Sequence, residues 1–461
     1  MDKFFRLKEK GSNVRTEIIA GFTTFFAMAY IIFVNPEILS ATGMSRGGVF
    51  VATVLSAALG TILIGLLANV PYAMAPGMGM NAFFAYTVCL GLGFAWQEAL
   101  AMVFICGIFG IIITATKLRS AIILAVPASL RNAIGAGIGL FIAYIGLKDG
   151  GILQFVGTES GVTAGSAAVP SFASFADNAV AVTLIGLMIT IVLMVLKVRG
   201  ALLISILATT IIALPFGVAS VPEKMFDLTA VGEINQVAFG LFGNPGFGSL
   251  FSDPSRVFLV IATVIAFLLT DVFDTIGTFL GTGMRTGIFT EAHFENMSKS
   301  KGFTTPMEKG LFADVTATAA GALLGTSNVT TYVESAAGIG EGGRTGLSSL
   351  VTAGAFLLCL PFASVIGIVP TQATSPVLII VGVLMMGSVL KIKWNDFEEA
   401  LPAFLAMLVM PMSYSITNGI AAGFISFCVV KFARGKFQEI HPMMYIVTAF
   451  FILNYVLTSV L

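Results

Sequence analysis

The stretch Thr326-Ser-Asn-Val-Thr-Thr-Tyr-Val-Glu-Ser-Ala-Ala-Gly338 places hydroxyl, amide and carboxyl groups inside a strongly apolar part of the chain. No charged residue occurs from Val315 to Val333, so Glu334 is expected to lie at membrane depth. The Ser, Thr and Asn residues predict non-helical backbone that leads into a half-helix. Such backbone is tolerated within a bilayer only where it is buried in protein or lines a cavity. We therefore expect Glu334 to face a ligand, and the simpler alternative is an acid that only caps the half-helix.

A second interrupted stretch, Ala75-Pro-Gly-Met-Gly-Met-Asn-Ala-Phe-Phe-Ala85, lies in the first half of the chain. Pro76 and Gly77 break regular helix, and we expect Asn81 to open the half-helix that follows. The Asn81 amide can donate hydrogen bonds to a ligand and accept one from it. The alternative is that Asn81 is a plain helix N-cap, which needs no ligand.

The composition requires a membrane around these stretches. Of the 461 residues, 57% are hydrophobic and 10% are charged, whereas average soluble domains carry about 25% charged residues. The excess apolar surface must face lipid or neighbouring membrane helices. Lys plus Arg equals Asp plus Glu, 24 against 24, so no basic surface points to a nucleic-acid partner. The four cysteines and two histidines lack the spacing of a metal site, and we expect no metal and no cofactor.

The spacing of the apolar stretches predicts an all-α polytopic membrane protein of about 14 transmembrane segments in two inverted seven-segment repeats. The third segment of each set, 79–93 and 330–341, is too short to cross as a regular helix and lies beside Gly, Pro, Ser or Thr. Short, interrupted segments at matching positions of two halves are typical of inverted repeats. The first repeat is predicted at 1–235 and the second at 236–440. Within 128–147, the run Gly135-Ala-Gly-Ile-Gly139 predicts a close helix-packing face. The expected segments are 16–39, 48–69, 79–93, 97–116, 128–147, 178–197, 200–217, 255–281, 311–326, 330–341, 345–366, 371–390, 396–412 and 414–434.

The loop charges predict the orientation. Every positive cluster follows an even number of predicted crossings, which places the N-terminus in the cytoplasm by the positive-inside rule. The C-terminal apolar segment, 441–461, breaks this alternation, and it either crosses the membrane or lies at its interface. The clusters are Lys3, Arg6, Lys8, Lys10 and Arg15; Lys117 and Arg119; Lys197 and Arg199; Arg285, Lys299, Lys301 and Lys309; Arg344; Lys391 and Lys393; and Lys431, Arg434 and Lys436.

Asp271 and Asp274 follow an uncharged run from Val257 to Thr270. Their i, i+3 spacing puts both on one helix face, and a carboxylate at membrane depth normally marks a site or a partner. Two nearby carboxylates repel each other when both are ionised, so one of them is expected to bind and release a proton. The alternative is a pair of acids that caps a broken helix.

Three further ionisable residues within or near the apolar segments are predicted to be mainly structural. Asp314 fits an acid in the first turn of its helix, Arg131 fits a side chain that snorkels or pairs locally, and Glu37 lies near the membrane interface.

A ligand for these acids should offer N–H donors, because carboxylates accept hydrogen bonds, and phosphate or sulfate would be repelled. Tyr332, Phe83 or Phe273 could stack on a flat ring. A planar heterocycle with ring N–H groups meets both demands, although a metal cation or a peptide would also suit acidic side chains.

At these residues the chain resembles the azaguanine-permease-like branch of the purine nucleobase permeases, relatives of the uracil and xanthine permeases. The similarity spans nearly the whole sequence. Its first acid in the eighth segment is an Asp and not a Glu, which suits the azaguanine-like branch and weakens a xanthine or uracil assignment. The motifs that carry it are Arg15-Thr-Glu-Ile-Ile-Ala-Gly-Phe-Thr-Thr-Phe-Phe-Ala-Met-Ala-Tyr-Ile-Ile-Phe-Val-Asn-Pro36, residues 75–84, residues 270–278, residues 326–338 and Gly342-Gly-Arg-Thr-Gly346.

The resemblance implies a secondary transporter, not an enzyme, that imports adenine, guanine or hypoxanthine by proton symport across the cell membrane. It implies a core domain (segments in 16–116 and 255–366) opposite a gate domain (segments in 128–217 and 371–434), with a homodimer as one candidate assembly. Its substrate-site positions correspond to Asn81, Asp271, Asp274, Tyr332 and Glu334. Asp271, Asp274 and Glu334 are the expected proton-coupling residues.

Three other functions are weighed against this one. An intramembrane aspartyl protease would use Asp271 and Asp274 as a catalytic pair, but such pairs come from two facing elements. An anion carrier of the same fold would need a cationic or neutral site. An ion channel would need neither the broken helices nor the coupled acids.

Overall fold

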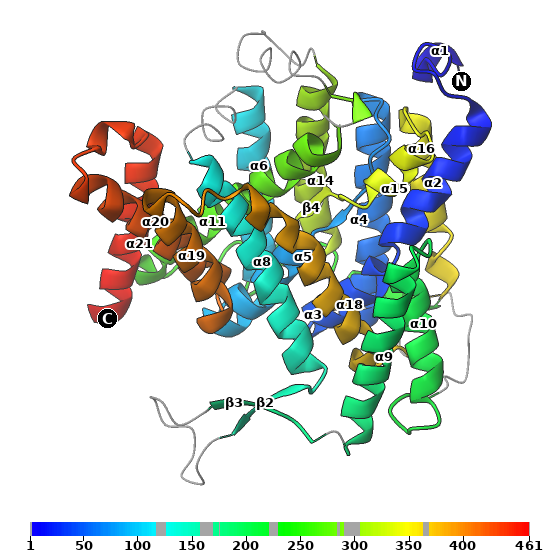
Figure 1. The fold of residues 1–461 in the computed structure, drawn as a ribbon, viewed down its shortest axis with the longest axis horizontal. Coiled ribbons are helices and arrows are strands. Elements are labelled where there is room, and N and C mark those ends of the chain that lie inside the picture. The colour runs from blue at the N-terminus through cyan, green and yellow to red at the C-terminus, as the bar shows by residue number, and fades with distance from the viewer. Residues whose placement is uncertain are drawn as a thin grey trace.

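The computed structural model describes residues 2–116, 126–156, 169–174, 176–220, 229–283, 286–289, 305–362 and 368–460. The described part is mostly helical, and eight helical stretches in it, one of them the interrupted stretch Val14–Ser40, are long and apolar enough to cross a membrane. Most of these helices run between the end that carries the N-terminus and the end that carries a small hairpin of strands β2 and β3 (Figure 1). The expectation of a polytopic helical protein is confirmed.

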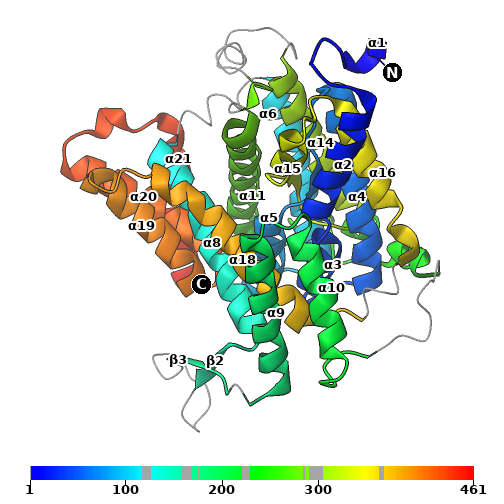
Figure 2. The ribbon, with the colours of Figure 1, turned by 45° about the vertical axis from the view of Figure 1, so that its right-hand side comes forward.

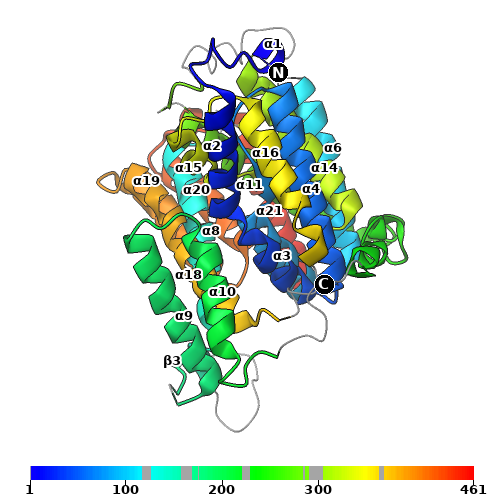
Figure 3. The ribbon, with the colours of Figure 1, turned by 90° about the vertical axis from the view of Figure 1, so that its right-hand side faces the viewer.

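The helices form two groups that pack mainly within themselves. In the first group α14 packs on α6 and α4, and α16 packs on α4 and α2; in the second, α18 packs on α8 and α9, and α19 on α20 and α8. Figure 2 shows the two groups beside each other, and Figure 3 shows α2, α16 and α4 in a row. The first group consists of α2 (Val14–Met28), α3 (Ile31–Ser40), α4 (Arg46–Leu67), α5 (Met78–Ala82) with its π-helical continuation η1 (Phe83–Gly91), α6 (Trp96–Ala115), α11 (Val257–Thr278) with η5 (Phe279–Gly283), α14 (Pro306–Leu324), α15 (Ser335–Gly340) and α16 (Gly346–Leu357). The second consists of α8 (Ala128–Asp149), α9 (Asn178–Val195), α10 (Ala201–Ala213), α18 (Thr371–Met385) with η7 (Met386–Lys391), α19 (Phe397–Met412), α20 (Ile416–Ala433) and α21 (Pro442–Val460).

The remaining elements are short. Strands β1 (Met74–Pro76) and β4 (Val329–Thr331) form one antiparallel pair, and β2 (Leu153–Val156) and β3 (Val169–Phe172) form another. The others are α1 (Asp2–Phe5) and the 3-10 turns η2 (Thr229–Gln236), η3 (Gly240–Phe242), η4 (Pro254–Arg256), η6 (Leu360–Phe362) and η8 (Phe437–Glu439).

Small residues let the helices approach closely, which matters in a membrane because apolar burial does not drive helices together there. A Cβ atom added to Gly382 of α18 would lie 2.5 Å from the carbonyl oxygen of Gly139 of α8. The predicted packing face at 135–139 is therefore confirmed for Gly139.

A buried carboxylate joins the beginning of the chain to its second half. Glu17 of α2 is fully buried, and it accepts hydrogen bonds from the backbone N–H groups of Arg344 (3.0 Å) and Ser348 (3.2 Å). These groups lie at the start of α16, where N–H groups lack partners within the helix. Glu17 thus stabilises α16 and holds α2 against it.

The C-terminal helix α21 lies antiparallel along α20. Cys428 and Thr448 are 3.4 Å apart at one end of the contact, and Tyr455 donates a 2.9 Å hydrogen bond to Asn418 at the other. Helix α21 therefore lies along α20 from Asn418 to Cys428.

The N-terminus and the segment after the fifth predicted crossing are expected on opposite sides of the membrane. The N-terminus and the β2–β3 hairpin lie at opposite ends in all three views, as an odd number of crossings between them requires (Figures 1, 2 and 3). Among the charges used for the prediction, Lys117, Arg119, Arg285, Lys299 and Lys301 lie outside the described residues.

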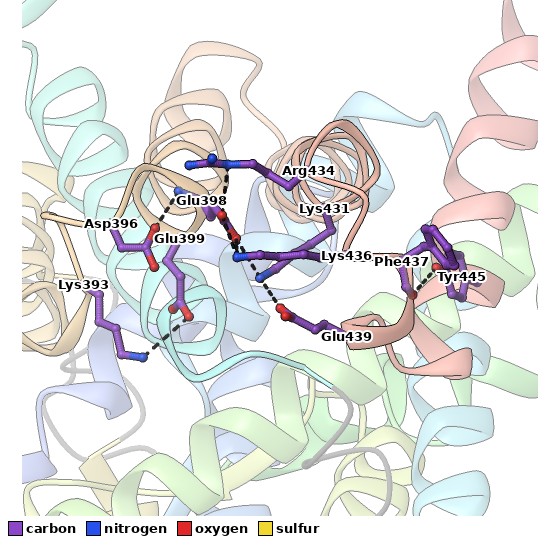
Figure 4. A network of polar contacts seen from close by, with 10 residues as sticks. All are labelled: Lys393, Asp396, Glu398, Glu399, Lys431, Arg434, Lys436, Phe437, Glu439 and Tyr445. Carbon is purple, nitrogen blue, oxygen red and sulfur yellow. Dashed lines mark hydrogen bonds and ion pairs between the residues drawn. The ribbon is translucent and has the colours of Figure 1, made fainter.

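An ion network ties together the ends of α19, α20 and η8 (Figure 4). The Glu398 carboxylate lies 3.0 Å from the Lys431 amine, 2.9 Å from the Lys436 amine and 3.1 Å from Arg434 Nε. Glu398 and Lys431 are both buried, and Lys431 also pairs with Glu439 at 2.7 Å. Because charges removed from water need partners, Glu398 is expected to hold this corner of the second helix group together.

We predict that Glu398→Ala lowers the thermal stability of the detergent-solubilised protein, since Lys431 and Lys436 lose a charged hydrogen-bond partner. The measurement is the shift of the thermal unfolding curve. Glu399→Ala is the matched control, because Glu399 pairs at 3.7 Å with Lys393, a lysine with 71% of its side chain exposed. Equal shifts for the two variants would contradict the prediction.

Candidate functional site

Strands β1 and β4 meet in the middle of the first helix group. They pair antiparallel, with Ala75 opposite Thr330, and all their residues are buried. Half-helix α5 begins directly after β1, and half-helix α15 follows β4 after a short turn. Each strand supplies the backbone partners that the other lacks where regular helix stops, as buried peptide groups require. The predicted extended segments that precede two half-helices are confirmed.

Glu334 lies at the start of α15 and is partly exposed, between the buried Tyr332 and Ser335. Its neighbour Val333 is 51% exposed, so this turn is accessible although it lies beside the buried strand pair. Glu334 makes no side-chain cap bond to α15. Instead, its Oε1 accepts a 2.7 Å hydrogen bond from the hydroxyl of Tyr30.

The two acids of α11 have different surroundings. Asp274 is partly exposed and lies close enough to Asp314 and Glu334 for electrostatic interaction. Asp271 is fully buried, and the Thr318 hydroxyl of α14 lies 3.4 Å from its Oδ2. Of the i, i+3 pair, Asp274 is thus the one that lies near Glu334, and Asp271 lies against α14.

The expectation that Asp314 is a first-turn acid is wrong. Helix α14 begins at Pro306, where Thr305 and Glu308 form a capping box, so Asp314 lies well inside the helix. It is fully buried and accepts a 2.6 Å hydrogen bond from Thr275 of α11. The prediction placed the helix start at 311, where the apolar run begins. The capping box of Thr305 and Glu308 starts the helix five residues earlier.

Thr275 connects Asp314 to the strand pair. Its hydroxyl also shares a 2.8 Å hydrogen bond with the Thr330 hydroxyl of β4. Asp314 therefore belongs to the same polar cluster as Asp274.

The expectation that Asn81 opens its half-helix is also wrong. Helix α5 starts at Met78 with Gly77 as its N-cap, so Asn81 lies within the helix. Its Oδ1 accepts a hydrogen bond from Ser327, which joins the half-helix of the first repeat to the segment before β4. Within the described residues its buried Nδ2 has no hydrogen-bond partner, which leaves a donor for a ligand or a water.

The aromatic candidates for stacking have different roles. Tyr332 is buried and donates a 2.6 Å hydrogen bond to the carbonyl of Pro76, so its hydroxyl already holds the two strands together. Phe83 packs edge-on against Phe267, with 4.5 Å between ring centres. The side chain of Phe273 lies outside the described part of the structure.

Tyr30 was not singled out from the sequence, although the structure places it on Glu334. It lies where α2 ends and α3 begins, and its side chain is 1% exposed. The sequence feature that could have indicated Tyr30 is its hydroxyl group, which lies in an apolar run just before Asn35-Pro36.

Chemically, the site offers two partly exposed carboxylates, Asp274 and Glu334, with tyrosine rings beside Glu334. Carboxylates can accept hydrogen bonds from N–H groups or hold a proton. Among the described residues no group of three or more His, Cys, Asp or Glu side chains is arranged to hold a metal ion.

Comparison with known proteins agrees with this architecture. A model of the Permease family matches residues 15–422. A putative permease of Methanocaldococcus jannaschii is 39% identical over 100% of this chain and 99% of its own length. The adenine permease AdeP of Escherichia coli is 37% identical (99% and 96% covered), and the guanine/hypoxanthine permease PbuG of Bacillus subtilis is 38% identical (99% of each).

Among solved structures, the transmembrane domain of the cyanobacterial bicarbonate transporter BicA aligns with a TM-score of 0.60 at 15% identity, covering 89% of this chain and 97% of that one. At this identity the likeness concerns the fold, which is an inverted-repeat transporter fold as predicted. The match over most of the sequence and the full-length relatives show that this chain is a transporter and belongs to the Permease family.

Proposed function

We propose that this protein imports adenine, guanine or hypoxanthine together with protons across the cell membrane, with its N-terminus in the cytoplasm. The observation that carries the proposal is that two partly exposed carboxylates, Asp274 of α11 and Glu334 at the start of α15, both lie beside strand β4. Relatives named as adenine and guanine/hypoxanthine permeases align with the chain from end to end, which supports purines as substrates.

The chemistry of the site suits a purine. The ring N–H groups of a purine donate hydrogen bonds, and the carboxylates of Glu334 and Asp274 can accept them. The buried Nδ2 of Asn81, which has no partner within the described residues, can donate to a ring nitrogen or carbonyl. Neighbouring ionised carboxylates repel each other. Binding of one proton among Asp271, Asp274 and Glu334 therefore favours the site with the purine bound. Proton entry and substrate binding are coupled in this way without a cofactor.

Transport requires the site to face each side in turn. We assign the helices of 16–116 and 255–366 to the core domain and those of 128–217 and 371–434 to the gate domain, which move relative to each other as units. One contact across this boundary is the 2.8 Å hydrogen bond from Tyr86 of η1 to Asp149 at the end of α8. In the proposed orientation this contact lies in the external half and closes the site from outside.

An anion carrier of the same fold is the second candidate, because the fold is shared with a bicarbonate transporter. The acidic groups around β1 and β4 weigh against it, since they would repel an anion.

The first test is uptake by proteoliposomes. Labelled hypoxanthine is expected to accumulate only with an inward proton gradient, and unlabelled adenine or guanine should compete with it, while bicarbonate should not. Uptake that ignores the proton gradient would overturn proton symport, and uptake of bicarbonate but no purine would favour the anion carrier.

Glu334→Gln is expected to reduce uptake by at least about tenfold with normal amounts of protein in the membrane, because loss of a charged hydrogen bond costs about 1.5–3 kcal/mol. Glu399→Gln changes an acid of α19 that pairs with an exposed lysine, and it should leave uptake unchanged. Normal accumulation of purine by the Glu334 variant would remove this residue from the site.

Tyr86→Phe is expected to open the external side, since it removes the hydrogen bond to Asp149. Val333→Cys serves as the probe, because Val333 is 51% exposed at the site. A membrane-impermeant maleimide added outside should label this cysteine faster in the protein that carries both Val333→Cys and Tyr86→Phe than in the protein that carries Val333→Cys alone. Tyr144→Phe is the control, since Tyr144 contacts Tyr414, a residue of the gate domain itself. Equal labelling rates would contradict the proposed role of Tyr86.

A further inference from the structure

We propose that Tyr30 is a positioning residue, whose hydroxyl holds one oxygen of Glu334 so that the other oxygen stays directed to the substrate. This inference rests on the proposed function and adds a residue from the first membrane helix to the site.

The position of Tyr30 along the chain makes it a rigid support. It occupies the break between α2 and α3. Its carbonyl accepts hydrogen bonds from the backbone N–H groups of Phe33 and Val34, at 3.1 Å each, and these bonds anchor it to the first turn of α3. Its flanking residues Met28 and Ile31 are fully buried. With 1% of its surface exposed, the ring has little room to change rotamer.

Glu334, in contrast, needs support. It is partly exposed beside Val333, and a glutamate side chain has three rotatable bonds that would otherwise stay mobile. The Tyr30 hydroxyl donates to Oε1 at 2.7 Å, within the range of strong O–H···O bonds. A hydrogen bond to an ionised acceptor is about twice as strong as one between neutral groups.

The other tyrosine near Glu334 does not take this role. The hydroxyl of Tyr332 donates to the Pro76 carbonyl at 2.6 Å, and a phenol has one hydrogen to donate. Tyr30 is therefore the hydroxyl that fixes Oε1 of the Glu334 carboxylate, and the proposal assigns Oε2 to a ring N–H of the substrate.

The test compares Tyr30→Phe with Tyr72→Phe. Tyr72 is a matched control, because it is fully buried in the same helix group and shares a 2.7 Å hydrogen bond with Thr282, a neutral partner. The measurements are KM and maximal rate of purine uptake in proteoliposomes, Kd of the same labelled purine for the purified protein in detergent, and the thermal unfolding curve.

Tyr30→Phe is expected to raise KM and Kd by roughly tenfold, the cost of one hydrogen bond to a charged group, while its loss of thermal stability is no larger than that of Tyr72→Phe. Tyr72→Phe should leave KM and Kd within about twofold of the unchanged protein, because a residue that shares no partner with Glu334 is expected to affect purine binding little. Unchanged KM and Kd in Tyr30→Phe, or an equal rise in both variants, would overturn the proposal.

A second measurement avoids any loss of the hydroxyl. 3-Fluorotyrosine placed at position 30 in the otherwise unchanged protein should show a shifted ¹⁹F signal when purine binds, and the same label at position 72 should not. A signal at position 30 that ignores saturating purine would count against the proposal. If the unchanged protein binds no purine at all, the proposed function fails, which these assays distinguish from a failure of the role of Tyr30.

Discussion

The structure depends on how it satisfies backbone peptide groups where two membrane helices stop in mid-span. Water is absent there, so unpaired N–H and C=O groups would cost several kcal/mol each. Pairing β1 with β4 solves the problem for both repeats at once, since each interrupted segment supplies the other's partners. The half-helices can then begin near the middle of the protein. The side chains at their start need not bond to the interrupted backbone, because the strand pair already does so.

The same requirement explains the polar cluster around the strand pair. Thr275 hydrogen-bonds to both Thr330 and Asp314, and Ser327 hydrogen-bonds to Asn81, so a buried network supports the partly exposed acids beside it. Polar groups inside a membrane protein are expensive unless they are paired. The paired groups form a scaffold, and Asp274 and Glu334 are the partly exposed carboxylates beside it.

Several features of the fold and the site were predictable because they follow from local rules. A run of about 20 apolar residues predicts a span, and two short segments beside Pro, Gly, Ser and Thr predicted the half-helices. The predictions for Asp314 and Asn81 failed on helix starts: the capping box at Thr305 and the N-cap at Gly77 lie outside the apolar runs that were used to place the helices. Tyr30 was missed because nothing near it in the sequence indicates a partner 304 positions away.

The sequence by itself determined that this is a membrane protein with a broken helix in each half, because hydrophobicity and helix breakers act over a few neighbouring residues, and its motifs resemble those of the purine permeases. Only the tertiary structure decided which acids meet. Asp271 and Asp274 share a helix, yet Asp274 lies near Glu334 and Asp271 lies against Thr318. The physical reason is that side-chain partners are set by how helices from the two repeats pack, and that packing joins residues hundreds of positions apart, such as Tyr30 and Glu334.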